Sequence, residues 1–143
     1  TGHKLVRFNE KERAGLRRFV ENGGLLFSDD CNHDVNGLYA KSFGAGASRI
    51  FDSPVPKLPN SHALYRAFFR FADGPPQTSH ELNGWGDNII HDYLRAHEVR
   101  GRLGVIYSNK DYGCEWDYER RNKRFRRDDN TRFAVNLVVY AMT

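Results

Sequence analysis

Long apolar runs, cysteine and repeated segments are scarce or absent in this sequence. No stretch approaches the ~18 consecutive apolar residues that a membrane-spanning helix requires, so the sequence predicts no transmembrane segment. The first twenty residues are charged and helix-like, and they lack the apolar core of a signal peptide. No internal repeat or low-complexity tract is present, so a repeat architecture is not expected.

The chain has only two cysteines, Cys31 and Cys114. Two cysteines outside a C-x-x-C pair cannot build a zinc finger. In an oxidising compartment they can form one disulfide, which closes a long loop and stabilises by about 4 kcal/mol on the chain-entropy model. In a reducing compartment they remain thiols that pack as small apolar groups. The sequence leaves both alternatives open.

Known catalytic and metal-binding motifs are also missing. There is no G-x-C-x-G or G-x-S-x-G turn around a nucleophile, no EF-hand loop and no H-E-x-x-H helix. Only groups of acidic, cysteine and histidine residues that lie close together in the sequence therefore indicate a site.

The composition is that of one globular domain. The chain has 143 residues, of which 39% are apolar and 28% charged, so residues 1–143 are expected to form a single domain with its own core. Part of the net charge of +4 comes from a basic segment, residues 120–127, which acidic residues flank on both sides. Without a reading helix or stacking aromatics this segment does not predict nucleic-acid binding.

Helical and strand patterns alternate along the chain. Asn9 and Glu12 form a capping-box pattern for a helix that ends near Glu21, before Asn22-Gly23. Buried strands are predicted over 25–27 and 103–107, a further strand over 94–99, and a last helix over 131–141. Between them we expect a helix over 36–43 that Gly44 and Gly46 end, a short strand over 48–51, a helix over 62–69, and long loops over 72–86 and 108–128. This alternation predicts an α/β fold.

Polar residues follow the two clearest strands. Asp29, Asp30, Cys31, His33 and Asp34 come after the first strand, and residues 109–114 follow the second. Ligands of open α/β sheets bind beyond the carboxyl ends of the strands. If the two strands are parallel, their ends share one edge and the two cysteines lie near each other.

Two chemistries are candidates at this edge. Cys31 can act as a nucleophile with His33 or another histidine, and Asp30 is a further catalytic candidate, although the surrounding acids oppose a thiolate. Oxygen ligands can instead bind a divalent cation, with His33 adding a preference for a transition metal. The alternative is that the first acids only cap the turn. The candidate metal ligands are Asp29, Asp30, His33, Asp34 and Asp111.

Trp85 and Trp116 lie in polar loops. If exposed, they suit stacking on a ligand or docking of a partner, and with Asp29, Asp30, Asp34 and Asp111 they complete the candidate ligand-binding residues. The alternative is that each indole fastens its loop to the domain.

Several motifs together resemble a bacterial family of uncharacterised domains. They are the run from Arg17 to Asp30, residues 101–108, residues 111–116 and residues 133–141, which cover most of the chain in the right order. The resemblance implies a class I glutamine-amidotransferase-like fold, a flavodoxin-like three-layer domain with a mostly parallel sheet. In catalytic relatives the nucleophilic cysteine would fall near Asp29 or Asp30 of this chain, so their catalytic residues do not carry over.

The resemblance also sets expectations about role and location. Family members generally carry earlier βα units, so this chain is expected either to be part of a longer domain or to have another chain complete its sheet edge. Relatives attached to the cell envelope imply a periplasmic location. We therefore expect a non-catalytic binding or assembly module of the bacterial envelope. The alternative is a hydrolase that uses Cys31 with a histidine, or a metal bound by Asp29, Asp30, Asp34 and Asp111.

Overall fold

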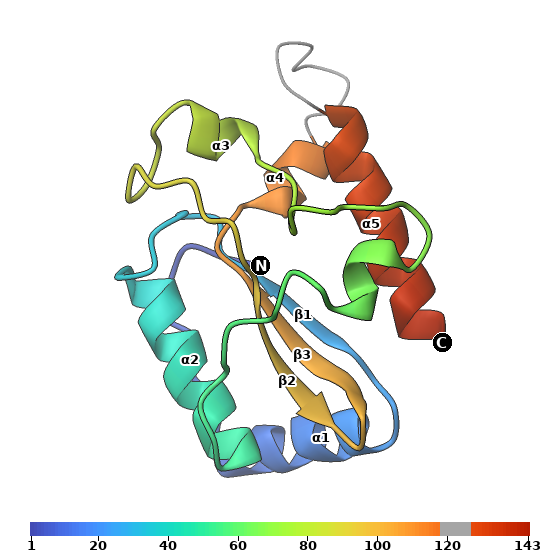
Figure 1. Cartoon of the computed structure of the whole chain (residues 1–143). Helices are drawn as coiled ribbons and strands as arrows, with labels where there is room; N and C mark the ends of the chain where they lie inside the picture. The colour runs from blue at the N-terminus through green and yellow to red at the C-terminus, as the bar shows by residue number, and fades with distance from the viewer. Residues whose placement is uncertain (118–126) are drawn as a thin grey trace.

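A three-stranded mixed sheet organises the computed structural model, which describes residues 1–117 and 127–143 (Figure 1). The strands are β1 (Leu26–Asp29), β2 (Arg95–Val99) and β3 (Arg102–Ser108), in the order β1-β3-β2. β1 runs parallel to β3, whereas β2 is antiparallel to it. The expected mostly parallel, flavodoxin-like sheet is thus not what the described residues form, because one of their two pairings is antiparallel.

A tight hairpin explains the antiparallel pairing. Arg100 and Gly101 separate β2 from β3, and both have positive φ angles, of 53° and 79°. Two successive left-handed residues are typical of a type I′ turn, which joins neighbouring antiparallel strands. A parallel pairing needs a crossover of a dozen residues or more, and this turn is too short for one.

Helix α1 (Glu10–Glu21) has the predicted capping box. Asn9 Oδ1 accepts from the Glu12 amide at 2.9 Å, and Glu12 Oε2 accepts from the Asn9 amide at 2.8 Å. The helix then packs closely on β3, where a Cβ on Gly104 would lie 2.2 Å from Val20 Cγ1. Glycine at position 104 is therefore required for this close approach.

Helix α2 (Leu38–Phe51) corrects the prediction of a shorter helix followed by a strand. It continues through Gly44 and Gly46, and residues 48–51 form its last turn. The buried residues of α2 are Tyr39, Phe43, Ala47 and Ile50. Their spacing makes one apolar face, and its burial outweighs the ~1 kcal/mol by which a helical glycine is disfavoured.

Two hydrophobic clusters pack on the sheet. The first includes Leu64 of the 3₁₀ helix η1 (Ala63–Arg66), Phe133 of α5 (Arg127–Met142) and Ile106 of β3. The second joins α1 and α2 to Val105 and Tyr107. Because successive strand residues point to opposite faces, the two clusters lie on opposite sides of β3.

Two short helices, α3 (Ser79–Leu82) and α4 (Tyr112–Asp117), lie beyond the carboxyl ends of β1 and β3 (Figure 1). The predicted loops over 72–86 and 108–128 contain them. The basic segment of residues 120–127 lies outside the described residues, apart from Arg127, at which α5 begins.

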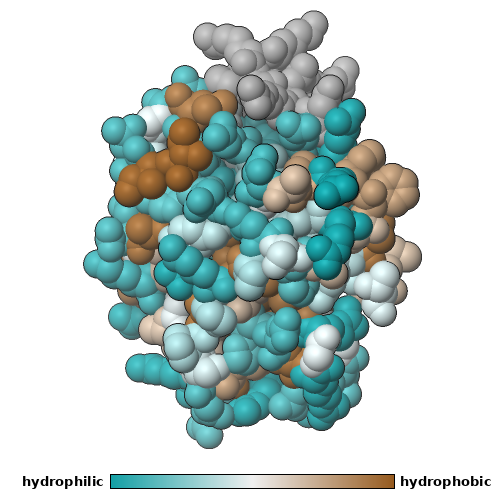
Figure 2. All heavy atoms as spheres, in the orientation of Figure 1, coloured by the Kyte–Doolittle hydropathy of each residue, from teal (hydrophilic) through white to brown (hydrophobic). Residues whose placement is uncertain are grey.

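The surface drawn in Figure 2 is mostly hydrophilic, with an apolar patch over the α3 segment, where Leu82, Ile89 and Ile90 are exposed. None of the helices in the described part of the chain combines the length and the apolar character that a bilayer span needs.

Candidate functional site

The parallel pairing brings two polar segments to one edge of the sheet. Asp29 at the end of β1 is paired in register with Ser108 at the end of β3. The chain beyond β1 therefore lies beside the chain beyond β3. α4 starts directly after Asp111 and returns Cys114 to the same place.

Four residues form what we call the thiol–carboxylate cluster: Asp29, Cys31, Asp111 and Cys114. The two sulfur atoms and a carboxylate oxygen of Asp111 all lie within 4.8 Å of one another. Asp29 adjoins them from β1, where its Oδ2 accepts a hydrogen bond from the Gly113 amide at 2.7 Å.

The two carboxylates of this cluster are deeply buried and incompletely paired. Asp29 is 2% exposed and Asp111 is 1% exposed. One oxygen of each, Oδ1, makes no hydrogen bond within the described residues. Burial raises the pKa of Asp29 to about 6 against the lowering effect of the Gly113 amide, and burial likewise raises the pKa of Asp111. Such unpaired buried oxygens are uncommon in folded proteins and call for an explanation.

The two thiols are held in the protonated form. Burial and then the Asp111 carboxylate raise the pKa of Cys114 to about 12. Burial also raises the pKa of Cys31, in spite of a 2.8 Å contact between its sulfur and the Thr1 hydroxyl. Because the thiolate is the reactive form, neither cysteine is activated as a nucleophile.

His80 of α3 faces the cluster. Its Nε2 lies 3.3 Å from Asp111 Oδ2, and its Nδ1 lies 4.0 Å from Glu115 Oε1. Nδ1 is buried and makes no hydrogen bond to the described residues. The ring is also in edge contact with Trp85, at 5.0 Å between centroids.

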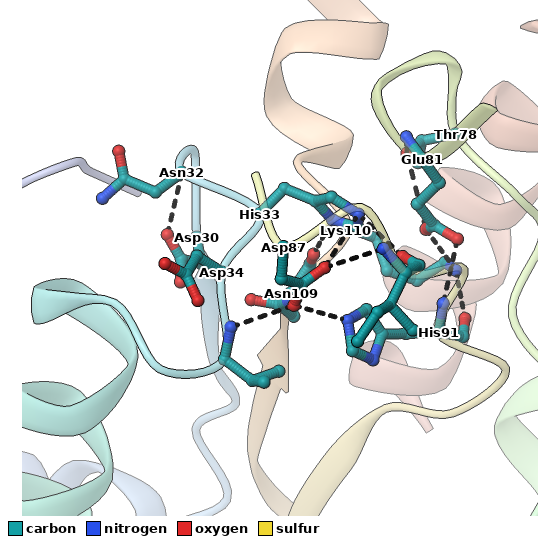
Figure 3. A network of polar contacts seen from close by, with 12 residues as sticks. Asp30, Asn32, His33, Asp34, Thr78, Glu81, Asp87, His91, Asn109 and Lys110 are labelled. Carbon is teal, nitrogen blue, oxygen red and sulfur yellow. Dashed lines mark hydrogen bonds and ion pairs between the residues drawn. The ribbon is translucent and has the colours of Figure 1, made fainter. Parts of the chain in front are cut away.

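A second polar group at the same edge, the histidine network, is fully paired (Figure 3). It consists of His33, Glu81, Asp87, His91, Asn109 and Lys110.

Lys110 lies at the buried end of this network. Its ammonium group pairs with Glu81 Oε1 and donates to the His91 carbonyl. Glu81 Oε2 accepts from the His91 amide at 3.2 Å. Burial raises the pKa of Glu81 and lowers the pKa of Lys110, and their mutual attraction opposes both effects. The pair thus fastens α3 and the loop after it to the end of β3.

The other end of the network joins the two histidines through Asp87. His91 Nε2 lies 2.8 Å from Asp87 Oδ2, which also accepts from the Val35 amide at 3.2 Å. His33 Nδ1 faces the Asn109 carbonyl, and its Nε2 faces the Ile89 carbonyl at 3.0 Å.

The structure separates the residues that the sequence grouped as one cation site. Asp30 Oδ1 accepts from the Asn32 amide and Oδ2 from the Tyr107 hydroxyl, while Asp34 Oδ1 accepts from the Asn36 amide. These two acids satisfy turns, as the alternative reading proposed. His33 belongs to the histidine network. The predicted ligand set therefore does not converge on one point, and only Asp29 and Asp111 of that set remain together.

The cysteines are adjacent, but both are free thiols in the structure, so the disulfide alternative is not supported. The geometry does not support the pairing of Cys31 with His33 as a base. His33 Nδ1 faces the Asn109 carbonyl and Nε2 faces the Ile89 carbonyl, so both ring nitrogens are directed at backbone oxygens.

The two tryptophans have different surroundings. Trp116 is partly buried, donates from Nε1 to the Asn130 carbonyl at 3.0 Å and stacks on Tyr112, so it fastens α4 to α5. Trp85 is 61% exposed beside His80. Only Trp85 is placed to meet a ligand at the surface.

Three residues of the histidine network were not named from the sequence: Glu81, Asp87 and His91. They lie in or just after the expected loop over 72–86, where no periodic pattern indicates which side chains turn inward. The one available signal is the density of histidine and acidic residues between His80 and Asp92.

Fold and site together define a small mixed α/β domain with a buried thiol–carboxylate cluster at the ends of two parallel strands. The chain belongs to the family described as domain of unknown function DUF4159, whose model matches residues 1–142. A search of curated proteins found no match. The family match agrees with the predicted resemblance to uncharacterised domains, and it does not bear on the amidotransferase-like fold.

Proposed function

We propose that the protein is a binding module for a positively charged ligand, which binds at the thiol–carboxylate cluster. One observation carries this proposal: Asp29 and Asp111 are both buried, and each has an oxygen without a hydrogen bond among the described residues. Among the ion pairs of that part of the chain, neither carboxylate has a lysine or arginine partner.

The electrostatics favour a cationic ligand. A carboxylate that is removed from water without a partner destabilises the fold, and a second carboxylate nearby adds repulsion. Asp29 and Asp111 raise each other's energy in this way, and Asp111 also disfavours ionisation of the thiols. A bound cation would offset all of these costs at once.

Hydrolysis with Cys31 as the nucleophile has weaker support. A nucleophilic cysteine needs a lowered pKa and a base within hydrogen-bond reach. The pKa of Cys31 is raised, and His33 is engaged with two carbonyls. A binding role is thus the better account of the same residues.

The remaining expectations rest on the resemblance. We propose an envelope location and an amidotransferase-like fold on that ground alone. β1 and β2 are the outer strands of the described sheet. Backbone hydrogen bonds from residues 56–58 already cover the first part of β2, so a partner chain that completes the sheet would pair with β1.

A cation panel tests the binding proposal. We expect the thermal midpoint of the purified chain to rise with at least one of Zn²⁺, Mg²⁺, Ca²⁺ or a small alkylammonium ion, because a ligand that binds only the folded state stabilises it. The rise should be lost in Asp29→Asn and Asp111→Asn and kept in the matched control Asp34→Asn. No rise with any cation would overturn the proposal, as would hydrolytic turnover that disappears in Cys31→Ala.

A further inference from the structure

We propose that the ligand is a thiophilic divalent metal ion of the Zn²⁺ type, bound by Cys31, Asp111 and Cys114, with His80 as the fourth ligand. This inference rests on the proposed function and narrows its ligand to one chemical class. It differs from the cation site that the sequence suggested, because sulfur and not only oxygen contacts the ion.

The first support is the convergence of three ligand atoms from two strand ends. The Cys31 and Cys114 sulfurs and an Asp111 oxygen already lie within 4.8 Å of one another. A tetrahedral Zn²⁺ site holds sulfur at ~2.3 Å and oxygen at ~2.0–2.2 Å, so that neighbouring ligand atoms are about 3.4 to 3.8 Å apart. Side-chain movements of about 1 Å would close the difference.

The second support is the chemical identity of the donors. Thiolate sulfur is a soft ligand that selects Zn²⁺ and related ions, whereas Ca²⁺ and Mg²⁺ prefer sites made of oxygen alone. Asp111 directly precedes α4 and Cys114 lies in the first turn of that helix, so both donors come from one short segment. Cys31 comes from the chain just after β1.

The third support is the arrangement of His80. Its Nε2 lies 3.3 Å from Oδ2 of Asp111, one of the three proposed ligands. Its Nδ1 faces Glu115, whose carboxylate accepts hydrogen bonds from the amide and the hydroxyl of Ser79. A metal-binding histidine typically donates its other ring N–H to a carboxylate, which fixes the orientation of the ring. Glu115 is the neighbouring carboxylate that could take this role once the present separation of 4.0 Å shortens to hydrogen-bond distance.

The charges and protons of the cluster are also consistent with a bound Zn²⁺ ion. Each thiol gives its proton to solvent as its sulfur binds the ion, so one Zn²⁺ displaces two protons. The two thiolates and Asp111 then surround the dication with three negative charges. Asp29 lies beside them and keeps the hydrogen bond from Gly113.

The other histidine- and acid-rich group is a poorer metal site. His33, Asp87 and His91 also bring ligand atoms within 4.8 Å of one another. However, His33 Nε2 faces the Ile89 carbonyl and His91 Nε2 already bonds Asp87. A metal there would have to break the hydrogen bonds of both histidines. In the thiol–carboxylate cluster it would displace the contact between Cys31 and Thr1, but it would supply a partner to the buried Asp111 carboxylate, which has an unpaired oxygen.

Cobalt titration of the reduced full chain tests the inference directly. We expect one Co²⁺ per chain, with the near-ultraviolet charge-transfer band of sulfur ligation and the intense visible bands of a tetrahedral site. One equivalent of Zn²⁺ should displace the cobalt and bleach both sets of bands. Co²⁺ binding without a charge-transfer band would overturn the inference, and this result needs no variant.

Variants then assign the ligands. Cys31→Ser and Cys114→Ser should each reduce the charge-transfer band by about half. His80→Ala should weaken Co²⁺ binding at least tenfold and shift the visible bands, while His62→Ala should leave both unchanged. His62 is the matched control, because its side chain and that of His80 are both 17% exposed. Circular dichroism of the metal-free variants checks that each is folded.

These results separate the inference from the proposed function. Stabilisation by a cation that is lost in Asp29→Asn but kept in both serine variants would leave the binding module standing and overturn the thiophilic metal. Unchanged affinity in His80→Ala would remove His80 from the ligand set. If no cation binds, both proposals fail.

Discussion

The thiol–carboxylate cluster and the histidine network lie at the same edge of the sheet and contain similar residue types, yet only one of them is satisfied. In the network, Lys110, Glu81 and His91 have partners within the fold. In the cluster, Asp29 and Asp111 are as deeply buried but keep unpaired oxygens. A buried network whose hydrogen bonds are all made stabilises the fold and positions its side chains. Buried polar groups without partners can instead obtain their missing interactions from a bound ligand. Residue type alone does not distinguish the two.

Breaking the network should give the largest effect. Lys110→Met leaves Glu81 buried without its cation, so we expect a loss of about 3 to 5 kcal/mol in the free energy of unfolding, measured in urea. The double variant Lys110→Met with Glu81→Gln should recover part of this loss, because the unpaired charge is gone. A loss below about 1 kcal/mol for the single variant would mean that the network is not the stabilising region.

The same kind of change in the cluster should act in the opposite direction. Asp29→Asn removes a buried negative charge that has no cationic partner among the described residues, so the metal-free protein should gain about 1 to 2 kcal/mol. Urea unfolding with a chelator present measures the change, and Asp34→Asn serves as the neutral comparison. Destabilisation by Asp29→Asn would erase the contrast between the two regions.

The pH dependence of the network gives a smaller effect. Partial burial alone would raise the pKa of Asp87, but hydrogen bonds from His91 and from backbone amides outweigh it, and the net pKa is lowered. A carboxyl group whose pKa is lowered by folding stabilises above its ordinary pKa of 3.8, and that contribution disappears as the pH falls through the lowered value. Asp87→Asn should therefore lose about 1 kcal/mol at pH 7 and match the original chain in strong acid. Thermal unfolding between these limits measures the difference, and a constant gap at every pH would contradict it.

The smallest effect is expected at the outer side of the cluster. Trp85 is 61% exposed, and its indole contacts His80 by an edge. Trp85→Ala should change the free energy of unfolding by less than about 0.5 kcal/mol, as exposed substitutions usually do. Trp116→Ala, at the partly buried indole, is the comparison and should cost several times more. An equal loss of unfolding free energy in the two variants would contradict this prediction, because it would mean that the exposed Trp85 stabilises the fold as much as the partly buried Trp116 does.

Local sequence signals predicted the parts of the fold that local interactions determine. The capping box of Asn9 and Glu12, the strand after Gly24 and the apolar run of β3 needed only neighbouring residues to be recognised. Gly44 and Gly46 predict a shorter helix than α2, but burial of its apolar face outweighs the low helical propensity of these glycines. The direction of β2 depends on the conformation of Arg100 and Gly101, which a turn signal alone does not specify.

The sequence predicted where the site lies better than it predicted which residues form it. Parallel strand ends correctly bring residues 29–31 beside 109–114. The contacts of each side chain depend on partners that are distant in sequence. Asp30 bonds Tyr107 of β3, His33 contacts the Ile89 carbonyl after α3, and Asp111 lies beside His80 of α3. No pattern in a loop encodes such pairings, because they follow from tertiary packing.

One feature ties the two regions together: they draw on adjacent residues of the same two segments. On α3, His80 faces the cluster while Glu81 holds Lys110, and after β3, Lys110 is followed at once by Asp111. The Lys110–Glu81 ion pair therefore fixes the position of the residues next to it, Asp111 and His80. It anchors the His80 and Asp111 backbones in the ligand-free chain, so little conformational entropy would remain to be lost if a ligand binds as we propose. The affinity for such a ligand would then depend on the Lys110–Glu81 ion pair as well as on the donor atoms.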